Sequence, residues 1–222
     1  MGSIKSKAKW IYNKFNVWAM LGVAALYYGK LMMYKASNRI NTEWHVITMG
    51  IDDWIPFCKY FVFFYFTYYW FSQLQLWLVS FGDKRKFYRL LIASFLSCVI
   101  SNICFLCYQV KMIRPEITGT DFFSSWVQWV YNHDGKAMNC CPSIHCVMGV
   151  AMIIGGYKTN KFPKWFQVLS AVFGVGCILS TVFIKQHYFI DLVLGTLLMI
   201  VVYWLVLIVD KKLQKKKQEA IA

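Results

Sequence analysis

The sequence predicts an all-α membrane protein with six transmembrane helices and both termini in the cytoplasm. Hydrophobic residues make up 59% of the 222 residues, whereas charged residues make up only 15%. A soluble domain of this size rarely carries so few charges. Apolar stretches of about 18 or more residues also recur along the chain, as in proteins that cross a bilayer several times. A third observation, the uneven distribution of Lys and Arg, sets the orientation.

Apolar stretches separated by charged or Pro-containing segments define the predicted helices in order. The fourth is short, so we expect its first turn to start below the membrane surface or its neighbours to shield it. Glycines in the last three helices would let those backbones pack closely. The helices are expected at Val17–Tyr34, Tyr60–Phe81, Phe87–Val110, Ser143–Tyr157, Trp165–Ile184 and Tyr188–Val209. Residues 1–222 would form one domain, with a catalytic core at about 107–195 and a basic tail at 211–222.

The connecting segments differ in charge on the two sides of the membrane. Segments 1–15, 82–89, 158–164 and 210–222 hold 16 of the 24 Lys and Arg residues but only three acidic residues. The other eight basic and seven acidic residues lie in the segments on the other side or in the helices that border them. The positive-inside rule therefore places both termini in the cytoplasm and the loop at 111–142 outside.

The net charge of +14 does not indicate a nucleic-acid partner, because it is concentrated at the cytoplasmic edge. Lys211–Lys217 is expected to face anionic lipid. We expect a multi-pass protein of a bacterial plasma membrane, with the lipid bilayer as its partner and the oligomeric state left open. Aromatic residues at 121–130 indicate an interfacial segment on the outer side. The eight scattered cysteines do not indicate a disulfide framework.

Two histidines lie at the edges of apolar stretches on the predicted outer face. His187 and Asp191 are four residues apart, so the carboxylate can reach one imidazole nitrogen from the same helix face. The other nitrogen would then be free as a nucleophile. Taken alone, the pair also fits a polar anchor at the interface or half of a metal site. Because no further ligand cluster lies nearby in sequence, no metal is expected.

The second histidine lies in the segment Pro142-Ser143-Ile144-His145, which is typical of a helix start with Ser143 as N-cap. A helix N-terminus offers N–H groups to a phosphate, and His145 could protonate a leaving alkoxide. The segment also fits an ordinary capped helix. Arg114, at the outer end of the third helix, could hold phosphate oxygens or extend to lipid phosphates.

Together these elements resemble the three sequence blocks of the type 2 phosphatidic acid phosphatase (PAP2) superfamily, K-x6-R-P, P-S-x-H and S-R-x5-H-x3-D. The resemblance covers most of the chain, and it is specific for the three blocks in order. Segments 52–57 and 134–139 are similar to a branch near the inositol-phosphorylceramide and sphingomyelin synthase-like lipid phosphotransferases. The residues that match the blocks are Arg114, Pro115, Pro142, Ser143, His145, Ser180, His187 and Asp191.

The resemblance implies phosphoryl transfer from a membrane lipid phosphate, without metal or cofactor. His187 would attack phosphorus to form a phosphohistidine, Asp191 would orient it, and His145 would protonate the departing alcohol. The resemblance also implies that Arg114 and the Ser143 region bind phosphate. Asp134 and Asn139 are weaker candidates for shaping the substrate site.

Two cations of the family blocks are missing, since Cys107 and Thr181 occupy their positions. We expect Lys111 and Lys185 to substitute as phosphate binders, from their positions alone. The leading hypothesis is a phosphatase that hydrolyses a phosphomonoester or pyrophosphate of a lipid at the outer leaflet. The alternatives are a phosphotransferase that passes a head group to a lipid alcohol, and an inactive relative that binds lipid or acts as a scaffold.

Overall fold

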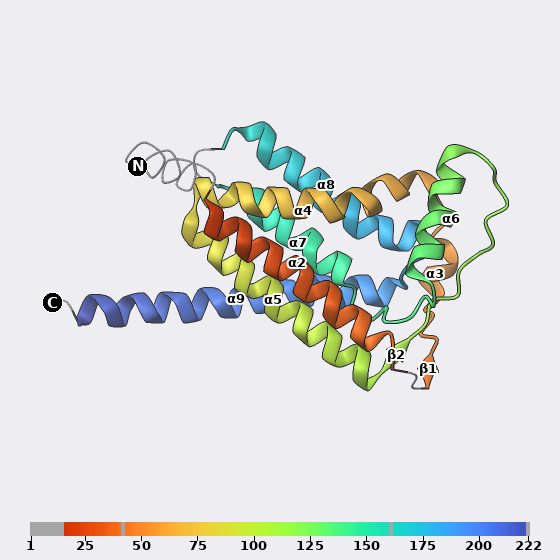
Figure 1. Cartoon of the computed structure of the whole chain (residues 1–222), viewed down its shortest axis with the longest axis horizontal. Helices are drawn as coiled ribbons and strands as arrows, with labels where there is room; N and C mark the ends of the chain where they lie inside the picture. Colours follow the sequence, from red (N-terminus) through yellow and green to blue (C-terminus); the bar gives the residue numbers. More distant parts are fainter. Residues whose placement is uncertain (1–15, 41–42, 160–161, 221–222) are drawn as a thin grey trace, which may run out of the picture.

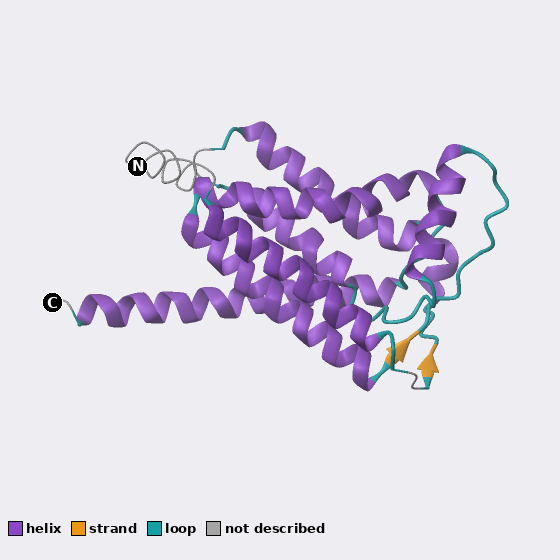
Figure 2. Ribbon diagram, in the orientation of Figure 1, coloured by secondary structure: helices purple, strands orange, loops and turns teal. Residues whose placement is uncertain are grey.

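The computed structural model describes residues 16–40, 43–159 and 162–220, which form an all-α bundle (Figure 1). The long helices run along one axis, and a pair of two-residue strands lies at one end of the bundle (Figure 2). The elements are α2 (Val17–Ser37), β1 (Trp44–His45), α3 (Gly50–Trp54), the 3-10 helix η1 (Lys59–Phe61), α4 (Val62–Gly82), α5 (Lys84–Cys107), β2 (Gln109–Val110), α6 (Phe122–Asp134), α7 (Ile144–Gly156), α8 (Lys164–Phe183) and α9 (Phe189–Glu219).

Each of the six predicted helices corresponds to a helix of the structure, and every end but that of α9 lies within three residues of its predicted position. The third was predicted to reach Val110, but α5 ends at Cys107 because Gln109–Val110 pairs in parallel with Trp44–His45. The last was predicted to end at Val209, but α9 continues to Glu219. The added turns consist largely of Lys, Gln, Leu and Glu, which have high helix propensity, so the predicted basic tail is helical as far as Glu219.

Three helices of the described residues, α5, α8 and α9, are long and apolar enough to cross a bilayer. The apolar α7 is shorter. Helices α2 and α4 each have 21 residues, but both contain polar and aromatic side chains that lower their hydropathy. These features are compatible with an integral membrane protein.

The short helix α7 lies at the centre of the bundle, where it contacts α4, α5, α8 and α9. Glycines permit its closest contact. A Cβ at Gly149 would lie 2.9 Å from the carbonyl oxygen of Gly174, and a Cβ at Gly174 would lie 2.6 Å from that of Gly149. This confirms the expectation of close backbone packing, and the surrounding helices shield α7.

The two ends of the bundle differ in composition. Helix α2 begins and α9 ends at one end, where Arg85 and Arg89 pair with Asp210. The other end carries α3, α6, the two strands and the loops that lead into α7 and α9 (Figure 1). Lys59 at the start of η1 pairs with Asp121, the N-cap of α6, at 2.5 Å. The polar loops and short helices therefore gather at this second end.

Candidate active site

A cavity of about 530 Å³ opens among α2, α4, α6 and the loop before α7. His145 and His187 both line it, although 41 residues separate them in the sequence. Their ring centroids are 5.7 Å apart. The fold therefore brings the two predicted histidines to one space.

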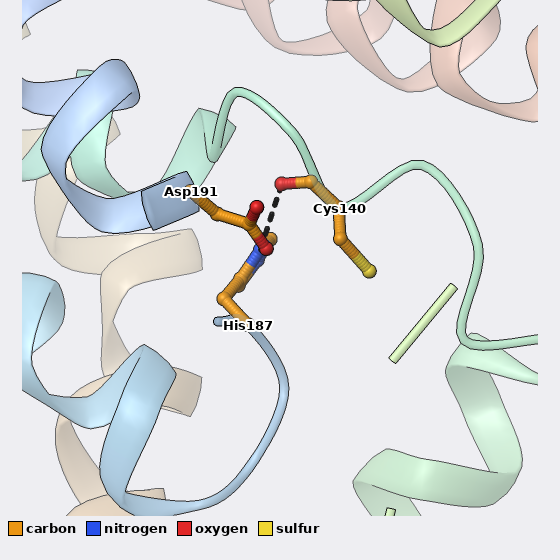
Figure 3. A group of neighbouring side chains, drawn as sticks. All are labelled: Cys140, His187 and Asp191. Atoms are coloured by element: carbon orange, nitrogen blue, oxygen red, sulfur yellow. Dashed lines mark hydrogen bonds and ion pairs between the residues drawn. The ribbon is translucent and has the colours of Figure 1, made fainter. Parts of the chain in front are cut away.

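His187 lies in the turn between α8 and α9 and is 7% exposed. Its Nδ1 nitrogen lies 2.9 Å from the carbonyl oxygen of Cys140 and 3.4 Å from the carboxylate of Asp191 (Figure 3). A carbonyl oxygen can only accept a hydrogen bond, so Nδ1 carries the proton. The Nε2 nitrogen of the neutral ring then has a free lone pair, as a nucleophile requires.

Asp191 is fully buried in the first turn of α9. Its Oδ2 atom accepts a hydrogen bond from the main-chain N–H of Tyr188 at 3.0 Å, which caps the helix. Its main-chain carbonyl accepts from the N–H of Ser143 at 3.2 Å. The Oδ1 atom has no hydrogen-bond partner among the described residues. Asp191 therefore joins the starts of α7 and α9 while its carboxylate faces His187.

Ser143 is the N-cap of α7, as predicted, and its hydroxyl accepts from the N–H of Cys146 at 3.4 Å. His145, the second residue of α7, lines the cavity. The His145 ring stacks on Tyr65 at 4.2 Å and packs against Tyr68 at 4.5 Å between centroids. Its Nε2 atom is buried without a hydrogen-bond partner in the part of the chain that the structure describes. The tyrosines thus hold the imidazole ring at the cavity wall.

Arg114 lies behind the cavity wall. Its guanidinium donates to the Tyr131 carbonyl at 3.1 Å, to the Asp134 carboxylate and to the side-chain oxygen of Gln186. Asp134 also accepts from the hydroxyl of Tyr34 at 2.7 Å. Asp134 and Gln186 line the cavity, but Arg114 itself does not. The arginine therefore anchors two cavity residues.

The two lysines expected to replace the missing family cations lie outside the cavity. The Lys185 amine donates to the carbonyl oxygens of Asp52 at 2.9 Å and Ile55 at 2.6 Å. The Lys111 amine lies 4.5 Å from the centroid of the Trp44 ring. All three partner residues belong to the segment around β1 and α3. In this geometry neither amine is among the cavity-lining groups.

Asn139 does line the cavity, next to the loop that leads into α7. Its side-chain amide donates to the Ser37 hydroxyl at 3.0 Å and to the Asn38 side chain at 3.1 Å. Asn139 adopts φ of 61°, a conformation that Asn tolerates better than most residues. It therefore ties the end of α2 to the loop that carries the Cys140 carbonyl.

Several groups of this site were not predicted. The Cys140 carbonyl is a main-chain group and leaves no signal in the sequence. The spacing of Tyr65, Tyr68 and Tyr69 places them on one helix face, but aromatic residues in a membrane helix are also typical of an interfacial belt or of helix packing. Lys30 also lines the cavity, and a lone charge in an apolar helix could have pointed to it.

Cys140, His187 and Asp191 form a group whose potential metal-ligand atoms lie within 4.8 Å of one another. Burial, with a further contribution from Asp191, raises the pKa of the Cys140 thiol well above its usual value. Metals bind the thiolate. A metal there would require deprotonation of a buried thiol, and binding through Nδ1 would replace the hydrogen bond from His187 to the Cys140 carbonyl.

The family model described as the PAP2 superfamily matches residues 86–215, which is more than half of the chain. The match spans α5 to α9 and includes Arg114, His145, His187 and Asp191. No curated protein shows a significant match to the chain. No solved structure shows one either.

Proposed function

This chain belongs to the PAP2 superfamily, and we propose that it is a membrane lipid phosphatase acting through a phosphohistidine on His187. The observation that carries the proposal is the common cavity of the two histidines, in which the Nδ1 proton of His187 is held by the Cys140 carbonyl. Superfamily membership suggests phosphatase or phosphotransferase chemistry, and this arrangement supplies a nucleophile and an acid for it.

In the first step, Nε2 of His187 attacks the phosphorus of a lipid phosphate. The bond from phosphorus to the alcohol oxygen breaks, and His145 gives a proton to that oxygen. Asp191 stabilises the positive charge that develops on the His187 ring, 3.4 Å from its carboxylate. In the second step, water gives a proton to His145 and attacks phosphorus, the N–P bond breaks, and phosphate is released.

The cavity wall supports a lipid substrate. Besides the histidines, its lining includes Tyr27 and Leu31 of α2 and Phe66 and Trp70 of α4. Trp70 is 73% exposed on the side of the bundle. An apolar chain could therefore lie between α2 and α4 while its phosphate reaches the histidines.

We further propose that the chain spans a plasma membrane six times. Both termini would lie in the cytoplasm, and the site would lie on the outer side. The basic segments that border α5, α8 and α9 support this orientation, by the positive-inside rule. The histidine-bearing turns lie at the end of the bundle opposite the start of α2 and the end of α9 (Figure 1).

The test is phosphate release by the purified protein from a panel of lipid monophosphates and pyrophosphates in detergent. We expect activity in wild type, its loss in His187→Ala, and its retention in His45→Ala. His45 is a suitable matched control because it stacks on Tyr108 outside the cavity. An active His187→Ala protein would exclude the proposed nucleophile, and an inactive wild type would favour a lipid-binding role without catalysis.

A phosphotransferase is the second candidate, favoured by Cys107 and Thr181 in place of the family cations and by the likeness of segments 52–57 and 134–139 to lipid phosphotransferases. The same chemistry serves it, with a lipid alcohol replacing water in the second step. Product that forms only after a lipid alcohol is added would favour the transferase.

A further inference from the structure

Lys30 is a buried cation in the middle of α2. It is 5% exposed and lies seven residues before the end of the helix at Ser37, about 10 Å along its axis. Its amine donates to the hydroxyl of Tyr68 at 2.6 Å and lies 4.7 Å from the centroid of that ring. A charged side chain inside an apolar helix is costly and usually serves a ligand or a partner.

Lys30 has no anionic partner among the described residues that would offset this cost. None of the ion pairs among the described residues includes it. Its contacts are the Tyr68 hydroxyl and the faces of the Tyr27 and Tyr68 rings. A neutral hydroxyl and aromatic rings stabilise an ammonium less than an anion does. The contacts of the buried amine therefore leave it able to bind a negatively charged group.

A ligand in the cavity that holds the histidines can reach Lys30, because Lys30 lines the same cavity. Tyr68 connects the two parts of the site, since its hydroxyl accepts from Lys30 and its ring packs 4.5 Å from the ring of His145. His145 in turn lies 5.7 Å from His187. The lysine is therefore beside the proposed acid of the reaction.

The other positively charged candidates are occupied or displaced. Arg114 is paired with Asp134, Lys185 with two carbonyl oxygens, and Lys111 lies over Trp44. At position 181, where the family block has arginine, the Thr181 side chain is fully buried and its hydroxyl donates to Ile178. Position 107 carries an exposed cysteine.

We propose that the ammonium of Lys30 binds the phosphoryl oxygens of the substrate, in place of the cations that positions 107 and 181 lack. The substrate class that follows is an anionic phosphate ester. This inference rests on the proposed function for the reaction, but the anion site itself can be tested without turnover.

The test is thermal unfolding of the purified protein in detergent with increasing inorganic phosphate, at constant ionic strength set with chloride. Ligands that bind the folded state raise its stability by mass action. We expect phosphate to stabilise wild type, and Lys30→Met to need about 10- to 100-fold more phosphate for the same shift, as for loss of one charged hydrogen bond. Lys164→Met is the matched control, since Lys164 is exposed at the start of α8. Lys30→Arg should retain the phosphate effect.

Kinetics on a lipid phosphate give the second measurement. We expect KM to rise in Lys30→Met by a similar factor, with a smaller change in kcat. Should Lys30→Met fail to fold, Lys30→Gln carries the same expectations. The inference would be overturned if phosphate did not stabilise wild type. It would also be overturned if phosphate stabilised Lys30→Met as well as it stabilises wild type. An inactive wild type that phosphate still stabilises through Lys30 would refute the proposed function and leave the anion site standing.

Discussion

The Nδ1 nitrogen of His187 lies closer to the carbonyl oxygen of Cys140, at 2.9 Å, than to the carboxylate of Asp191, at 3.4 Å. The main chain therefore fixes the tautomer of the proposed nucleophile. In the proposed mechanism, Asp191 then stabilises the positive charge that develops on the ring, and it also caps α9 by accepting from the Tyr188 N–H. Substitutions of His187 and of Asp191 should therefore lower the rate to different extents.

Asp191→Asn should lower kcat by about 10- to 100-fold, the range for loss of one charged hydrogen bond. The asparagine oxygen can still accept from Tyr188, so the melting temperature should stay close to that of wild type. Steady-state kinetics and thermal unfolding on the same preparation check both parts. A loss as large as that of His187→Ala would mean that the Cys140 carbonyl does not hold the tautomer.

His145→Ala should lower the rate with alkyl phosphate esters by about 100- to 10,000-fold, because general acid catalysis contributes this much. The effect should shrink for a nitrophenyl phosphate, whose leaving group departs without a proton. The burst of nitrophenol under rapid mixing measures this first step. Equal losses with both leaving groups would contradict the role of His145 as the acid.

Lys185→Met should act on stability more than on substrate binding. The Lys185 amine donates to the carbonyl oxygens of Asp52 and Ile55, so the substitution removes two charged hydrogen bonds that hold the α3 segment. We expect the free energy of unfolding to fall by at most about 1.5–3 kcal/mol for each hydrogen bond. KM should change little. The opposite result, a raised KM at unchanged stability, would favour the original hypothesis of phosphate binding.

Cys140→Ala tests the metal alternative, since only the main-chain carbonyl of this residue is needed in our account. Activity should be retained in the variant and in EDTA. Burial raises the pKa of the Cys140 thiol, and it raises that of Cys141 to about 12 with a contribution from Asp191. Both thiols should therefore react slowly with alkylating reagents at pH 8. Loss of activity in EDTA that zinc restores would contradict the metal-free mechanism.

The sequence predicted the parts of this fold that depend on local pattern. Apolar stretches located the helices α2, α4, α5, α7, α8 and α9, and Ser143 was identified as a cap from its position before an apolar stretch. The end of α5 could not be predicted, because it depends on the pairing of Gln109–Val110 with Trp44–His45, distant in the chain. Helix α9 continues past residue 209 because the residues beyond the apolar stretch have high helix propensity.

The candidate site, too, could be predicted only where it depends on residues close in sequence. The contact between His187 and Asp191 follows from their spacing of four residues. The contact with Cys140 joins residues 47 apart, and Lys30 reaches the cavity from a helix that precedes every matched block. Closeness in sequence was also misleading, since Lys185 lies two residues before His187 but its amine bonds to the α3 segment.

The central claim is a covalent bond between His187 and phosphorus, and trapping that bond tests it most directly. The protein would be mixed with a lipid phosphate labelled with radioactive phosphorus, quenched in alkali within milliseconds and digested to peptides. We predict label on the peptide that contains His187, stable in alkali, lost in acid, and absent in His187→Ala. Label on another residue, or equal labelling of His187→Ala, would contradict the account.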